Sequence, residues 1–158
     1  MKTIKLLLIT FCAMLSSCTG DVIFSEQTKI ENCTWDMNNP VVFDVSTDDI
    51  DTICCYDLQV TMRHDETYPN QNIWLFVESQ NETGFTSRDT LQCFLVDNYG
   101  HWIGSGVGTL HYISVYYKEN YRFPHKGSWR YTIRHGMRDS QLKGIVNVGL
   151  RIERHKNK

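Results

Sequence analysis

The sequence has no apolar run long enough to span a bilayer and no segment rich in proline, glycine and serine. Only 3 of the 158 residues are proline and 10 are glycine. No stretch longer than a turn or two repeats apolar residues at helical spacing, so helices do not build the core. Without a linker composition or an internal repeat, the chain is predicted to form one domain.

Metal and catalytic motifs are missing as well. The acidic run Asp48, Asp49 and Asp51 lacks the turn glycine and distal glutamate of a calcium loop. The 6 histidines show no H-x-x-x-H spacing. Gly104-Ser105-Gly106 is not the G-x-S-x-G motif of a hydrolase. We therefore expect no metal, no cofactor and no catalytic residue.

The N-terminus has the parts of an export signal. Lys2 and Lys5 precede an apolar segment that is too short to cross a membrane. The segment closes with Leu15-Ser16-Ser17-Cys18, which resembles a bacterial lipobox at all four positions. We expect a signal peptide over residues 1–17 and lipid on Cys18, which would anchor the protein to a membrane.

Removal of the signal changes the charge only slightly. Without Lys2 and Lys5, 14 basic residues face 18 acidic ones, which gives a formal charge of −4. This balance does not suggest a nucleic-acid partner. Residues 18–30 are polar and are predicted to be a tether, and residues 31–158 are predicted to form the folded domain.

Four cysteines remain besides Cys12 and Cys18. Adjacent Cys54 and Cys55 would point to opposite faces of a strand, and their spacing from Cys33 and Cys93 fits neither a zinc site nor C-x-x-C. An oxidising periplasm permits one bridge from Cys54 or Cys55 to Cys93 or Cys33. Buried free thiols are the alternative.

Alternation of apolar and polar residues at period two dominates the rest of the chain and predicts strands with one buried face. Segments 73–78 and 91–96 are apolar at successive positions and are predicted to be buried on both faces. A short helical turn is expected around 139–142. The predicted strands are 41–45, 56–63, 73–78, 91–96, 110–117, 129–134 and 146–153.

Seven or eight strands joined by short polar turns must bury two inner faces around one core. This pattern favours an all-β fold, a two-layer antiparallel β-sandwich of immunoglobulin-like or jelly-roll type. A closed barrel is the second interpretation.

Two places are candidates for interaction. The Gly-rich segment 100–108 carries Trp102, whose ring could fill a partner's pocket or plug the end of the sandwich, and Gly104, which permits a tight backbone path. The last two predicted strands and their connection carry basic side chains suited to a partner's carboxylate, or to clamping a loop. These candidates are Arg134, Met137, Arg138 and Arg151.

Several motifs together resemble one known family. They are Tyr68-Pro69 followed by residues 72–76, the segment 100–106, Gly136-Met137-Arg138, and residues 142–153. In this order, behind a lipobox, they are similar to the gliding motility lipoprotein family GldH of Bacteroidetes. The resemblance implies an envelope lipoprotein of surface gliding, associated with the apparatus that supports type IX secretion. It implies no activity, cofactor or catalytic residue.

The sequence thus supports a non-enzymatic interaction protein that is anchored in the cell envelope through Cys18 and binds envelope proteins. Residues 19–22 lack an acidic cluster resembling a surface-export signal, so we expect the domain to face the periplasm. A carbohydrate-binding module is the alternative, because exposed aromatic rings stack on sugars. Its candidate rings are Trp74, Trp102, Tyr116, Tyr117 and Trp129. An enzyme whose residues converge from distant loops stays open.

Overall fold

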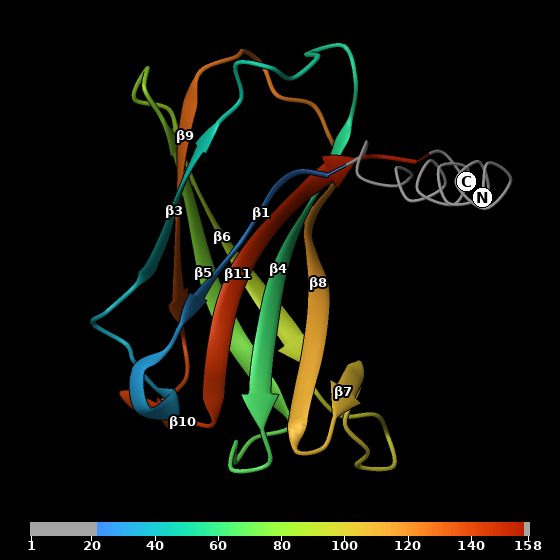
Figure 1. Ribbon diagram of the computed structural model, residues 1–158. Coiled ribbons are helices and arrows are strands. Elements are labelled where there is room, and N and C mark those ends of the chain that lie inside the picture. Colours follow the sequence, from blue (N-terminus) through green and yellow to red (C-terminus); the bar gives the residue numbers. More distant parts are fainter. Residues whose placement is uncertain (1–21, 157–158) are drawn as a thin grey trace, which may run out of the picture.

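The computed structural model describes residues 22–156, which fold into two antiparallel sheets that face each other as layers (Figure 1). One sheet has the order β1-β11-β4-β8-β7, and the other has the order β3-β9-β5-β6. A short pair, β10-β2, lies at one end. The predicted all-β sandwich is confirmed, and the sheets do not close into a barrel.

The strand bounds follow the chain in order. They are β1 (Val22–Lys29), β2 (Thr34–Asp36), β3 (Val41–Ser46), β4 (Tyr56–Asp65), β5 (Asn72–Asn81), β6 (Thr86–Phe94), β7 (Ser105–Val107), β8 (Leu110–Tyr121), β9 (Ser128–His135), β10 (Gln141–Lys143) and β11 (Ile145–Arg154). A single turn of 3-10 helix, η2 (Glu31–Cys33), joins β1 to β2.

The core lies between the two sheets and is built by the period-two alternation. β4 and β11 contribute aliphatic side chains from one layer, while β9 contributes Trp129, Tyr131 and Ile133 from the other. Burial of each such side chain stabilises the fold by about 1.5–3 kcal/mol. The predictions for β3, β4, β5, β8, β9 and β11 are therefore confirmed as strands.

Two local expectations are wrong. Residues 22–29 form β1, which pairs with β11 from Val22 opposite Glu153 to Lys29 opposite Asn147. The predicted tether therefore does not extend over these residues: β1 is polar because its side chains are largely exposed, and its backbone completes the sheet. The helical turn at 139–142 is replaced by β10, which pairs with β2. The predicted signal peptide and Cys18 lie outside the described residues.

β5 and β6 also differ from the prediction, because neither strand is buried on both faces. In β5, Ile73, Leu75 and Val77 point into the core, while Trp74 and Phe76 are 39% and 41% exposed on the outer face. β6 is the edge strand of its sheet, and its residues are exposed or partly buried except for the buried Cys93. Aromatic residues on an exposed sheet face produce the apolar appearance of a central strand.

The sandwich has two distinct ends. At the first, called here the entry end, Val22 begins β1 and Arg154 pairs with Tyr56. At the other, called here the far end, β10 leads into β11, and Ile145 pairs with His64. The loop from β9 to β10 lies at the far end, so it is separated from Val22 by the length of the sheets (Figure 1).

Candidate functional site

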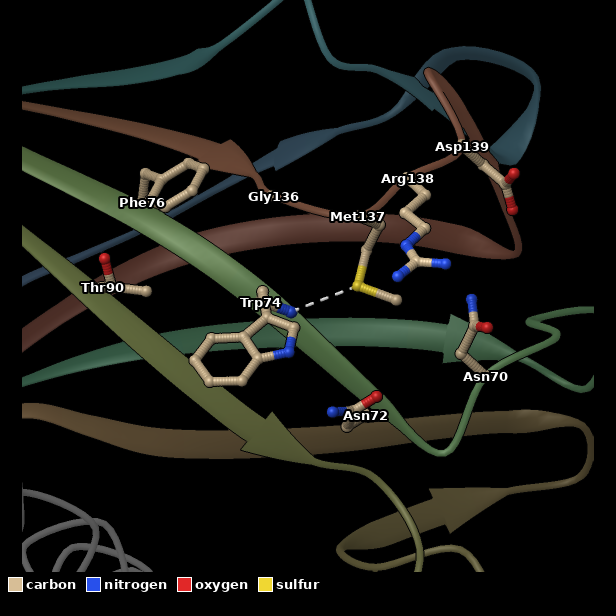
Figure 2. Close-up of a pocket in the computed structure, with 9 residues that line it drawn as sticks. All are labelled: Asn70, Asn72, Trp74, Phe76, Thr90, Gly136, Met137, Arg138 and Asp139. Atoms are coloured by element: carbon tan, nitrogen blue, oxygen red, sulfur yellow. Dashed lines mark hydrogen bonds between the residues drawn. The ribbon is translucent and has the colours of Figure 1, made fainter.

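A surface groove with a volume of about 580 Å³ lies on the outer face of the second sheet, near the far end. Its walls come from β5, β6 and the loop that follows β9, and Figure 2 shows the side chains gathered around it. The lining residues are Asn70, Asn72, Trp74, Phe76, Thr90, Gly136, Met137, Arg138 and Asp139. We call this the β5 groove.

The aromatic floor of the β5 groove follows from the pleat of β5. Because side chains alternate between faces, Trp74 and Phe76 share the outer face while their neighbours fill the core. Gly136 lies beside Phe76, and a Cβ at this position would come within 2.7 Å of the ring atom Cε2. A glycine at 136 therefore lets the chain pass close to the ring.

The backbone of β5 is incompletely paired at this point. β9 pairs with β5 as far as His135 opposite Leu75, and the Gly136 amide then donates to the Trp74 carbonyl at 2.7 Å. Beyond Gly136 the chain turns away. The Trp74 amide donates instead to the Met137 sulfur at 3.4 Å, the contact drawn in Figure 2. A thioether is a weak acceptor, so this amide is poorly satisfied.

The groove carries one basic side chain, Arg138, which has no ion pair within the described residues 22–156. Within residues 22–156 the structure gives no ion pair or hydrogen bond for the exposed side chain of Arg138, and the same holds for Arg134. Arg138 lines the groove, and Arg134 lies opposite Phe76 in the sheet register, next to the aromatic floor. Asp139 is the one acidic residue among those that line the groove.

The predicted interaction residues separate into three places. Met137 and Arg138 line the β5 groove, and Arg134 borders it. Trp102 and Gly104 lie elsewhere, beside the β7–β8 hairpin. Arg151 is on the other sheet, where it is paired with Glu153 at 2.8 Å.

Trp102 is half-buried and packs against histidines. Its ring lies 4.6 Å from the His64 ring and 5.5 Å from the His111 ring, measured between centroids. Ile103 donates to the Leu95 carbonyl at 2.7 Å, which holds the segment against the sandwich. Trp102 therefore plugs the edge of the first sheet, and its ring is not free for stacking as Trp74 is.

Arg151 contributes to a second groove of about 560 Å³ on the outer face of the first sheet. Ser25, Gln27, Arg63 and His111 also line it. Since Arg151 already pairs with Glu153, its charge is partly neutralised. Tyr112 also lines this groove, but its side chain is less exposed than those of Trp74 and Phe76.

The sequence did not identify the aromatic floor of the β5 groove as a candidate site. Trp74 was one of several rings suited to sugars, and Phe76, Asn70, Asn72 and Thr90 carried no signal of their own. The alternation along β5 could have indicated the site. Trp74 and Phe76 lie on one face of the strand, while aliphatic residues lie on the other. Of the other candidate rings, Trp129 is buried at 1% exposure and Tyr116 is exposed on β8.

The polar clusters noted in the sequence have structural partners. Asp51 accepts hydrogen bonds from the Ile53 amide and the Cys54 thiol, which lowers the pKa of its carboxyl group. Across residues 22–156 no group of three or more His, Cys, Asp or Glu side chains is placed to hold a metal ion. The cysteines of this range are free thiols, and Cys93 is buried.

No helix among residues 22–156 is both long and apolar enough to cross a membrane. The fold and the groove define an antiparallel β-sandwich with an aromatic, positively charged surface groove at one end. No solved structure matches this chain.

Comparison by sequence assigns the family. The family model described as GldH lipoprotein matches residues 22–152. The chain is 30% identical over 151 residues to the gliding motility lipoprotein GldH homolog of Christiangramia forsetii, covering 91% of each chain. It is also 30% identical over 154 residues to the gliding motility lipoprotein GldH of Flavobacterium johnsoniae, covering 93% of this chain and 94% of the relative.

The protein belongs to the GldH lipoprotein family. This confirms the resemblance found in the sequence. A lipoprotein family places the protein at a membrane of the cell envelope, and the names of both relatives link the family to gliding motility.

Proposed function

We propose that this protein is a non-enzymatic accessory of the gliding and type IX secretion machinery. Lipid on Cys18 holds it to a membrane with the sandwich facing the periplasm, and it acts by binding another envelope protein. The observation that carries the proposal is the β5 groove, where Trp74 and Phe76 are exposed beside Arg138, which has no ion pair among the described residues.

The placement of the groove supports this role. Val22 begins β1 four residues after Cys18. Four extended residues reach at most about 14 Å, so the entry end would lie close to the membrane surface. The β5 groove is near the opposite end and would point away from the bilayer, where a periplasmic partner can reach it.

The composition of the groove also suits a protein partner. Interfaces use aromatic residues, methionine and arginine more than other surfaces do. Trp74 and Phe76 supply aromatic rings to the groove, and Arg138 supplies an arginine. The names of the relatives describe lipoproteins of gliding motility, which supports an assembly role over catalysis.

The test is affinity purification of the tagged, lipidated protein from cross-linked cells, with mass spectrometry of the partners and of Cys18. We expect a gliding or secretion component to be enriched, with less recovery from Cys18→Ser cells because the anchor is lost. Trp74→Ala should reduce the cross-link, while Arg88→Gln, which alters an exposed side chain on β6 already paired with Glu78, should not. Recovery of no envelope partner by either lipidated or unlipidated protein would count against the proposal.

A carbohydrate-binding module is the second candidate, and the exposed ring of Trp74 favours it. Asn70, Asn72 and Thr90 offer hydrogen-bonding groups around that ring. A glycan array comparing wild type, Trp74→Ala and Trp102→Ala decides. Binding that is lost with Trp74→Ala alone supports a sugar site in the groove, whereas no binding by wild type removes it.

A further inference from the structure

We propose that the β5 groove binds an extended acidic peptide segment, with one peptide carbonyl replacing the Met137 sulfur on the Trp74 amide and a peptide carboxylate pairing with Arg138. This rests on the proposed function, since the peptide is taken to be part of the partner protein. On binding, the contact between the Met137 sulfur and the Trp74 amide opens.

The first step concerns the Trp74 amide. It belongs to an inner strand, yet its hydrogen-bond acceptor is a thioether at 3.4 Å and not a backbone carbonyl. A carbonyl is the stronger acceptor, so exchanging sulfur for a peptide carbonyl improves this bond. Met137 lies in a loop and is only partly buried. Its side chain packs against the edge of the core, and because it is flexible and unbranched it can repack when a ligand displaces the sulfur.

The second step concerns the spacing of the aromatic floor. Trp74 and Phe76 are two residues apart on one face of β5, a rise of about 7 Å. Alternate side chains of an extended peptide have the same spacing, so two of them can rest on the two rings. A helical ligand presents its neighbouring side chains three and four residues apart and does not match this repeat.

The third step concerns charge. Arg134 and Arg138 border the groove without an ion pair in the described residues, whereas Arg88 on the neighbouring strand pairs with Glu78 at 2.6 Å. The free guanidiniums can each take a carboxylate in a bidentate manner. Arg138 in the lining and Arg134 beside it outnumber Asp139, the one acid that lines the groove, so an acidic ligand is favoured over a basic one.

The test uses the mature chain, residues 18–158, carrying Cys18→Ser, so that every described strand is present. Random dodecapeptides displayed on phage are selected against it, and the enriched peptides are synthesised and titrated. We expect acidic residues alternating with apolar ones. Arg138→Gln should weaken binding about tenfold or more, as expected for a lost charged hydrogen bond, while the matched control Arg88→Gln leaves it unchanged.

The displacement of Met137 has its own readout. In a ¹⁵N-labelled sample the backbone amide resonance of Trp74 should shift downfield when the selected peptide binds, because it gains a carbonyl acceptor. Met137→Ala should leave affinity unchanged or raise it. If Met137→Ala weakens binding as much as Arg138→Gln does, then Met137 is a ligand contact, and the displacement step is wrong.

Other outcomes overturn the whole inference. They are enriched peptides without acidic residues, equal binding by Arg138→Gln, no enriched peptide at all, or glycan binding that is lost with Trp74→Ala. The two proposals fail separately. A partner that cross-links equally to wild type and Arg138→Gln leaves the proposed function standing without this site. Peptides that bind in the expected manner while no envelope partner is recovered leave the site standing without that function.

Discussion

His64 and His111 lie opposite each other in the register of β4 and β8, and their rings stack with centroids 5.3 Å apart and 26° between planes. Trp102 covers the pair, and the Nε2 atoms of both histidines are buried without a hydrogen-bond partner in the described structure. Burial of the His64 ring without a partner for Nε2 disfavours its charged form.

Acid is therefore expected to lower the stability of the fold. Burial lowers the pKa of His64 below its ordinary value, and the pKa of His135 is lowered by burial in the same way. The unfolded chain then binds protons more readily than the native protein does, so the free energy of unfolding decreases as the pH falls below about 6.5. Urea unfolding at about pH 7.5 and pH 5 measures this loss.

Replacing His64 and His135 together provides the control. A His64→Gln/His135→Gln variant lacks the two titrating rings, so its stability should change less between those pH values, whatever its absolute stability. An unchanged pH dependence in the double variant would show that other groups cause the acid sensitivity.

Gly104 is expected to be required for packing as well as for its backbone conformation. Its φ is +103°, and a Cβ would collide with the Tyr112 carbonyl, whereas Gly100 has a φ of +85° with nothing within 4 Å of an added Cβ. Both alanine variants share the backbone strain, but only Gly104→Ala adds the collision. Gly104→Ala should lose about 1–3 kcal/mol more stability than Gly100→Ala in urea unfolding. Equal losses would mean that the chain near Gly104 relaxes freely.

Tyr117 connects the two sheets through a hydrogen bond. Its hydroxyl donates to the Asp89 carboxylate at 2.7 Å, joining β8 to β6. Tyr117→Phe should lower the free energy of unfolding by about 1 kcal/mol, while Tyr116→Phe, at an exposed position on the same strand, should change it little.

The hydrogen bond from Tyr117 is also the largest cause of the lowered pKa of Asp89. The stabilisation is present at neutral pH and is lost as the pH falls below about 4. Tyr117→Phe should therefore reduce the acid-dependent loss in that range, which titration of stability against pH can check. A variant with the wild-type profile would contradict the assignment.

The tryptophans should separate into surface and core residues. Trp74 is 39% exposed and Trp129 is 1% exposed. Trp129→Ala should cost about 3–5 kcal/mol, since it leaves a cavity beside Phe123 and Tyr131, and Trp74→Ala should cost less than about 1 kcal/mol. Thermal and urea unfolding measure both. A large loss with Trp74→Ala would mean that it is a core residue and would weaken its use as a binding probe.

Cys93 should be chemically silent in the native protein. It is buried, and burial raises the pKa of its thiol to about 12, so little thiolate forms at neutral pH. With a thiol reagent, Cys33, Cys54 and Cys55 should react before unfolding, and Cys93 only after it. Rapid labelling of Cys93 in the folded state would contradict its burial, and a mass lowered by two hydrogen atoms would reveal a disulfide.

Much of the fold could be predicted because strand periodicity is local. Leu58, Val60 and Met62 on β4 are buried, as the pattern indicated. The polar residues between them, Asp57, Gln59 and Thr61, are buried too, so the expectation of a single buried face is wrong for β4. β1 could not be predicted this way, because its side chains are largely exposed and its backbone pairing with β11 fixes it. For the same reason residues 141–143 became β10, since β2 supplies their hydrogen bonds.

The candidate site could be predicted only in part. Met137 and Arg138 were chosen from the sequence and line the β5 groove, but Trp102 and Arg151 are placed away from it. The contact between Trp74 and Met137 could not be predicted, because 63 positions separate the two residues and no local pattern links them. The exposure of Trp74 could not be predicted either.

The sequence by itself determined the lipoprotein family, the all-β class and most strands, because these depend on short motifs and on alternation between neighbouring residues. Only the tertiary structure decided which face of β5 is open, which arginines lack a partner, and that β9 leaves β5 at Gly136. These features depend on which strands lie side by side, and strand pairing joins residues that are far apart in the chain.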